Sequence, residues 1–126
     1  MKWNTNWKKT SKPGKKRKYA YNAPKHAARS LVSAHLTKTL KKKHGTRSFP
    51  VKKGDKVKIM RGDFKGTEGK IEKVIYKAKK IIIDKIKIEK KDGTKTSRPV
   101  DPSKVEITEF NMEDKKRSKA LERRKK

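Results

Sequence analysis

The segment at residues 51–74, VKKGDKVKIMRGDFKGTEGKIEKV, decides the fold of this 126-residue chain. In its first part apolar and charged residues alternate, so that Val57 and Ile59 face a core while the lysines between them face solvent. A second strand is expected at residues 71–76. Three glycines lie between the two patterns, and glycine adopts positive φ angles and lets a partner approach the backbone closely. The segment therefore predicts two strands joined by a glycine-rich turn at residues 61–70.

Two other interpretations of this turn fail. A phosphate-binding loop needs a glycine, four residues, Gly-Lys and then Ser or Thr. Here Phe64 stands at the first glycine position and Ile71 at the hydroxyl position. The tripeptide Arg61-Gly62-Asp63 matches an adhesion signal, which acts outside the cell. The chain shows no signal-peptide pattern and no apolar run of about 20 residues, so we expect an intracellular protein without a membrane span.

Further strand patterns follow the turn. Isoleucines at residues 81–88 predict a third strand, interrupted at Asp84-Lys85 by a bend or bulge. Asp92-Gly93 predicts a hairpin turn, residues 94–100 a fourth strand, and residues 105–107 a fifth. Five short strands within about 60 residues predict a small antiparallel barrel. The expected fold class is therefore mainly β.

The charge balance predicts a polyanionic partner. The chain carries 41 Lys and Arg against 13 Asp and Glu, a formal net charge of +28, and only 29% of its residues are apolar. RNA, DNA and an anionic membrane surface are the candidates. A membrane surface is disfavoured because no stretch shows strong amphipathic character. The absence of cysteine excludes disulfides and cysteine-based zinc sites.

The basic residues begin in an N-terminal arm that contains no acid. Residues 1–50 hold 15 Lys or Arg and no Asp or Glu. Residues 1–19 show no hydrophobic periodicity and are expected to be extended. Pro24 is well placed to open a helix over about residues 24–34. A second helix is expected over about residues 37–44, with Thr37 as N-cap and Gly45 ending it.

The C-terminal residues place acids first and bases last, which favours a helix because of its dipole, or else a basic tail. Three regions are therefore predicted. Residues 1–48 form a basic RNA-binding arm with short helices, residues 49–110 a barrel, and residues 111–126 a basic helix or tail.

Basic clusters recur beside aromatic residues. This pattern favours nucleic-acid binding, because cations neutralise phosphates and exposed rings stack on unpaired bases. Trp3, Trp7, Tyr19, Tyr21 and Phe49 are the candidate rings. The alternative for Tyr21 and Phe49 is that they pack the arm onto the barrel, which explains Phe49 at least as well as base stacking does. Phe64 either caps the barrel end or contacts a sugar or base. The predicted RNA-binding residues are Lys15, Lys16, Arg17, Lys18, Tyr21, Lys25, Arg29, Lys41, Lys42, Arg47, Lys53, Lys56, Lys58, Arg61, Gly62, Phe64, Lys65, Gly66 and Lys70.

No catalytic or metal site is expected. The three histidines, His26, His35 and His44, all lie in the acid-free arm, and a metal site needs several converging ligands. The acids alternate with lysines on expected strands, where surface ion pairing explains them. The sequence therefore predicts neither an enzyme, nor a cofactor, nor a small-molecule substrate.

The residues on either side of the central segment narrow the interpretation from nucleic-acid binding in general to a resemblance with one protein family. Residues 51–74 resemble the KOW motif of ribosomal proteins and transcription elongation factors. YNAP at 21–24, RSFPVKKGDKVKIMRGDFKG at 47–66, KDGT at 91–94 and NMEDKKR at 111–117 resemble, in order, the archaeal and eukaryotic form of the large-subunit ribosomal protein of the L-twenty-four family. The resemblance departs locally, with Asp101-Pro102-Ser103 in place of His-Pro-Ser and Asp84-Lys85-Ile86 in place of Glu-Gly-Val.

The resemblance implies an SH3-like barrel whose extensions lie on large-subunit rRNA. It implies a structural, non-catalytic role near the polypeptide exit tunnel and in subunit assembly, with neighbouring ribosomal proteins as partners in the cytoplasm. Residues 61–66 correspond to the family's KOW turn and residues 15–29 to its rRNA-threading arm. The alternative is a DNA-binding or transcription-associated KOW protein, which would usually carry a further domain before the motif.

Overall fold

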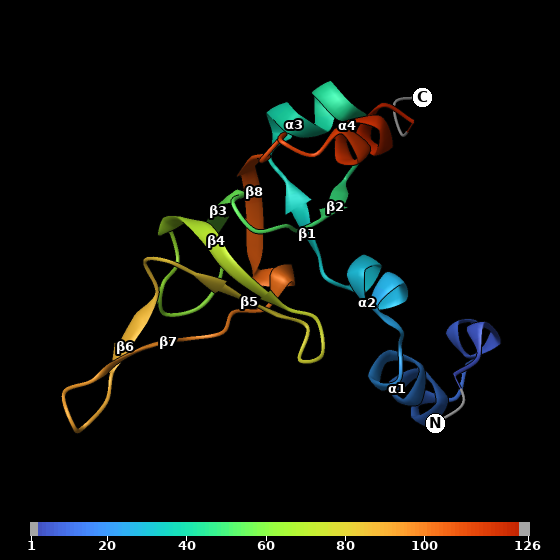
Figure 1. Ribbon diagram of the computed structural model, residues 1–126, viewed down its shortest axis with the longest axis horizontal. Coiled ribbons are helices and arrows are strands. Elements are labelled where there is room, and N and C mark those ends of the chain that lie inside the picture. Colours follow the sequence, from blue (N-terminus) through green and yellow to red (C-terminus); the bar gives the residue numbers. More distant parts are fainter. Residues whose placement is uncertain (1–2, 124–126) are drawn as a thin grey trace.

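The computed structural model describes residues 3–123 and confirms a mainly β fold (Figure 1). The strands are β1 (Ser33–Leu36), β2 (Ser48–Pro50), β3 (Lys56–Ile59), β4 (Glu68–Ile75), β5 (Lys80–Ile83), β6 (Lys87–Glu89), β7 (Lys95–Ser97) and β8 (Val105–Glu109). The helices are α1 (Pro13–Tyr21), α2 (Lys25–Leu31), α3 (Lys38–His44) and α4 (Lys115–Glu122), with short 3-10 helices η1 (Thr5–Lys8) and η2 (Pro102–Lys104).

Six strands form one sheet in the order β2-β1-β8-β3-β4-β5. Most neighbours are antiparallel, as predicted, but β1 runs parallel to β8. The strand β8, last in the sequence, thus lies between β1 from the arm and β3 from the predicted barrel. β6 and β7 form a separate two-stranded hairpin that projects from the sheet, closed by Gly93 with a φ of 79° (Figure 1).

The helix predicted over about residues 24–34 is wrong beyond Leu31. The structure ends α2 at Leu31 and begins β1 at Ser33. The physical reason is a change of period, because Val32, Ala34 and Leu36 are buried while the residues between them are only partly covered. Alternate burial is the pattern of a strand.

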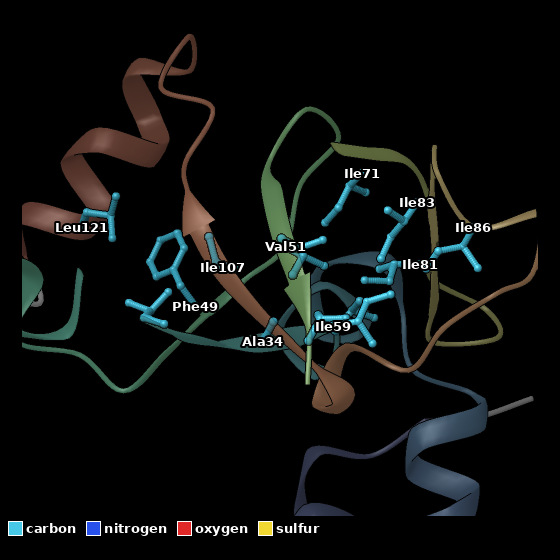
Figure 2. Packing of buried hydrophobic residues seen from close by; sticks show 14 residues of the cluster. Ala34, Phe49, Val51, Ile59, Ile71, Ile81, Ile83, Ile86, Ile107 and Leu121 are labelled. Atoms are coloured by element: carbon cyan, nitrogen blue, oxygen red, sulfur yellow. The ribbon is translucent and has the colours of Figure 1, made fainter. Parts of the chain in front are cut away.

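The core is a cluster of buried apolar side chains that come mainly from the strands, with Leu121 contributed by α4 (Figure 2). Val57, Ile59 and Ile107 of the expected strands are buried, as their alternation predicts. Phe49 is also buried, which supports its packing role. Leu121 of α4 lies beside Phe49 at one end of the cluster, so the C-terminal segment is a helix docked on the sheet (Figure 2).

The expected interruption of the third strand is confirmed. β5 ends at Ile83 and β6 begins at Lys87, while Ile86 between them is fully buried. The fourth strand is shorter than predicted and covers only β7; beyond it, Val100 forms an isolated bridge with Ile81.

The extended arm predicted at residues 1–19 is wrong in the described part, because η1 and α1 form there. Pro13 at the first position of α1 favours the helix start. The second predicted helix is confirmed as α3, with Gly45 in the left-handed conformation at a φ of 63°. Within the described residues, no helix is long and apolar enough to cross a membrane. The predicted boundary between residues 48 and 49 stays a prediction, and β2 straddles it.

Candidate nucleic-acid interface

The turn between β3 and β4 has the backbone that its glycines predict. Gly62 and Gly66 have φ angles of 99° and 88°, and the amide of Gly66 donates to the carbonyl of Ile59 at 2.8 Å. A Cβ at either glycine would meet no atom within 4 Å, so the positive φ is what requires glycine there. Gly69 differs, because a Cβ on it would lie 2.6 Å from Cγ2 of Ile83. Its close approach therefore serves the packing of β4 on β5.

A hollow of about 320 Å³ opens beside this turn, towards β5 and the segment from β7 to η2. The two acids in its wall are both held in ion pairs. Arg98 donates to Asp63 at 2.9 Å, and Lys80 contacts Asp101 at 2.5 Å. The negative charge of the hollow is therefore neutralised locally. Sequence reasoning missed the cations at 80 and 98, because only the fold brings them to the turn.

The turn presents cations outward and keeps its ring on the core. Arg61 and Lys65 are exposed, and within residues 3–123 neither has an ion-pair partner. Lys104 lines the same hollow, and its carbonyl accepts the amide of Met60 at 2.8 Å, which ties η2 to the turn. Phe64 is half-buried against the core cluster, which favours the capping alternative for this ring.

The lysines predicted on the strands differ in what surrounds them. Lys56 pairs with Glu109 at 2.5 Å and Lys58 with Glu68 at 3.2 Å, both across neighbouring strands. Exposed pairs of this kind contribute about 0–1 kcal/mol and break easily in favour of a phosphate. Lys70 stands opposite Lys56 in the register and has no ion-pair partner among the described residues.

Helix α1 carries four consecutive cations at residues 15–18, and all four of these side chains are exposed. An aromatic cluster fixes its position. The indole N–H of Trp3 donates to the carbonyl of Tyr19 at 3.2 Å, and the two rings lie 5.2 Å apart. The ammonium of Lys18 lies 5.0 Å from the Trp7 ring. These rings, predicted as base-stacking candidates, therefore pack the arm on itself.

A third basic region lies around the hollow between α2 and α4. Lys25 and Arg29 of α2 are exposed and line neighbouring hollows together with Asp114, and Lys116 and Arg123 border the same region. Sequence reasoning missed Lys116 and Arg123 as neighbours of α2, because the C-terminal segment was expected as a helix or tail without a docking place.

The remaining predicted residues lie apart from these groups. Lys41 is half-buried in the last turn of α3, while Lys42 and Arg47 are exposed nearby, and Lys53 is exposed in the loop before β3. Figure 1 shows α3 and α1 at separate places along the molecule. The structure thus distributes the predicted residues over several basic regions instead of one patch.

Asp114 anchors the start of α4. Its carboxylate accepts from the Lys52 ammonium at 2.9 Å and from the amide of Lys116 at 2.9 Å. These hydrogen bonds, that from the Lys52 side chain first, lower the pKa of Asp114 below its ordinary value of 3.8. The carboxyl group of Asp114 is therefore ionised at neutral pH.

Two of the three histidines contact aromatic rings. His26 meets the Trp3 ring edge-on at 6.1 Å, and His44 meets Phe110 in the same way at 5.6 Å. His35 lies within β1. Among the described residues, no three His, Cys, Asp or Glu side chains gather to hold a metal ion.

The most buried polar contact joins Asp55 to Arg117, 62 residues later. The guanidinium donates to both carboxylate oxygens, at 2.5 and 2.6 Å, and both side chains are almost fully buried. The amides of Lys52 and Asn111 donate to the same carboxylate, and the guanidinium lies 5.0 Å from the Phe110 ring. Sequence reasoning placed Asp55 at the start of an alternating strand pattern and Arg117 in the C-terminal helix or tail, and no local pattern marks such a pair.

Comparison with known proteins matches residues 10–124 to the family described as ribosomal proteins L26 of eukaryotes and L24P of archaea. A protein of Methanospirillum hungatei named large ribosomal subunit protein uL24 is 49% identical over 112 residues, which cover 89% of this chain and 93% of that one. Proteins of the same name from Korarchaeum cryptofilum and Methanosphaera stadtmanae are 47% and 44% identical, over 92% and 91% of this chain and 88% and 98% of theirs.

Proposed function

Because the chain belongs to the family of ribosomal proteins L26 and L24P, we propose that it binds and organises the RNA of the large ribosomal subunit. The family has a structural role in the ribosome and no catalytic one. The finer parts of the proposal are a position near the polypeptide exit tunnel, a role in subunit assembly, and contacts with neighbouring ribosomal proteins in cytoplasmic ribosomes.

The observation that carries the RNA-binding proposal is the turn between β3 and β4. Its backbone is fixed by two positive-φ glycines, and it presents Arg61 and Lys65 with no acid to pair them in the described structure. Guanidinium groups bind phosphate oxygens in a bidentate way. Asp63 and Asp101 beside the turn are already neutralised by Arg98 and Lys80. A phosphate backbone can therefore approach this hollow without meeting uncompensated negative charge.

The arm supports the same proposal in a different way. No side chain of helix α1 is fully buried, and its ring contacts are with Trp3 and Trp7 of the arm, so packing ties the helix to the arm more than to the sheet. Its four consecutive cations repel one another until phosphates neutralise them. We propose that the sheet docks on RNA through the turn and that α1 then settles along the phosphate backbone.

Sedimentation tests the proposal most directly. The tagged protein is expected to travel with large subunits in high magnesium. Co-sedimentation with nucleoid DNA or with RNA polymerase, and absence from large subunits, would instead favour the alternative KOW-type DNA-binding or transcription role.

A matched pair of variants tests the turn. Arg61→Gln with Lys65→Gln is expected to lower incorporation into large subunits, whereas Lys115→Gln with Lys119→Gln removes the same charge from the exposed side of α4 and is expected to lower it less. Equal loss in the two variants would show that total charge, and not the turn, determines incorporation.

A further inference from the structure

The ring of Tyr21, at the C-terminal end of α1, lies largely in solvent. It is 73% exposed, the highest value among the large hydrophobic side chains that the structure leaves open. Tyr19, two residues earlier, is half-buried against Trp3. Within residues 3–123, no ring or hydrogen-bond partner of the Tyr21 side chain is found. A tyrosine this exposed, with no partner among the described residues, contributes little to the stability of the fold, so its ring is free for a ligand.

A hollow of about 500 Å³ lies at this ring. Its walls come from the end of α1 and from the turn that joins β4 to β5, and they are mainly apolar. Arg17 and Lys18 of α1 and Lys79 of the turn border it, and no acid of the described residues lines it. The hollow therefore combines an apolar floor with a cationic rim, which suits a ligand that is aromatic and anionic at once.

The backbone at Lys79 carries strain. Its φ of 54° is the only positive φ at a residue other than glycine in the described chain. Left-handed backbone costs a residue with a Cβ about 1–3 kcal/mol when the surroundings enforce it, and such residues concentrate at functional sites. A glycine would fit here without strain. The tight turn, in which the amide of Lys79 donates to the carbonyl of Tyr76 at 3.3 Å, holds this conformation and places Lys79 at the rim of the hollow.

We propose that this hollow holds one unpaired nucleotide of RNA, with the base stacked on the Tyr21 ring and the flanking phosphates held by Arg17 and Lys79. The proposal rests on the proposed function and adds a discrete subsite to it. Stacking on an aromatic side chain holds any base, because every base has a π-face. The ammonium of Lys18 already lies at the Trp7 ring, so Arg17 and Lys79 are the cations left to bind phosphate.

The test uses the full chain and two RNA probes of equal length. One is a hairpin with a single unpaired 2-aminopurine, and the other is the same hairpin with that base paired. Binding is expected to change the 2-aminopurine fluorescence only in the unpaired probe. Tyr21→Ala is expected to weaken affinity for the unpaired probe on the order of 5- to 100-fold, while Tyr21→Phe keeps it, since the ring alone stacks.

Lys79→Gly separates binding from folding, with Lys77→Gly in the same turn as control. Lys77 is exposed and does not line the hollow. Both variants lose one charge, but Lys79→Gly is expected to raise the unfolding midpoint in urea and to weaken the unpaired probe more than Lys77→Gly does. If Lys79 had only a structural role, Lys79→Gly would not raise stability and at the same time weaken binding of the unpaired probe.

Two outcomes would overturn the subsite. One is an unpaired probe whose fluorescence does not change on binding, and the other is a Tyr21→Ala variant that loses affinity for both probes equally. Neither outcome affects the proposed function, which fails only if the wild-type chain is absent from large subunits.

Discussion

At the scale of single residues, glycine and charge positions determine what the turn can do. Gly66 has a φ of 88°, and a Cβ added there would meet no atom within 4 Å, so the cost of a side chain at this position is backbone strain. Gly66→Val is expected to destabilise the fold by about 1–3 kcal/mol, because a β-branched residue resists this conformation. Urea unfolding measures the loss, and incorporation into large subunits is expected to fall with it.

Gly14→Val provides the control for this variant. Gly14 lies in α1 without a positive φ, and a Cβ there also meets nothing within 4 Å. Equal stability of the two variants would show that the strain argument for Gly66 is wrong.

The buried pair of Asp55 and Arg117 makes a second prediction at this scale. Arg117→Leu leaves the carboxylate charged and buried, and removing one partner of such a pair costs about 3–5 kcal/mol. Arg123→Leu removes an exposed cation just after the end of α4 and is expected to change stability by no more than about 0.5 kcal/mol. Guanidinium unfolding compares the two variants, and a similar small effect in both would refute a structural role for the pair.

At the scale of elements, the strands of the central segment were predictable because each alternates locally. Val57 and Ile59 face the core in β3, as their spacing indicates. β1 was missed although Val32, Ala34 and Leu36 alternate too, because the preceding helical pattern hides the change of period. Contacts made only by the fold, such as that of Arg117 with Asp55, leave no trace in local sequence.

Helix α4 has an acid-sensitive anchor. The pKa of Asp114 is lowered by its hydrogen bonds, so the folded protein binds its proton less readily than the unfolded chain. The stabilisation is present above the ordinary value of 3.8 and is lost as pH falls through the lower folded pKa. We expect NMR signals of Leu121 to shift in this range, below pH 4, before the sheet unfolds.

Asp114→Asn tests this assignment. The variant is expected to lose the pH dependence of the α4 signals below pH 4, because the amide does not titrate. An unchanged titration in the variant would assign the acid sensitivity to another carboxyl group.

At the scale of the whole molecule, a net charge of +28 governs how RNA is bound. Phosphate binding releases counterions, so log affinity is expected to fall linearly with log salt, by about 0.7–0.9 per contact. Arg61→Gln with Lys65→Gln removes two such contacts and is expected to reduce this slope by about 1.4–1.8. Filter binding over a salt series measures it, and a flat wild-type response would exclude the basic residues as the binding surface.

The place of β8 in the sheet has a consequence for biosynthesis. β1 and β3 leave the ribosome early, yet they do not pair with each other, because β8 lies between them. The nascent chain therefore cannot close its sheet until residues 105–109 have been made, and Leu121 and Arg117 add the final cover. Only when this part of the chain has been made can the carbonyl of Lys104 accept the amide of Met60, so the brace between η2 and the basic turn is among the last contacts of the sheet to form.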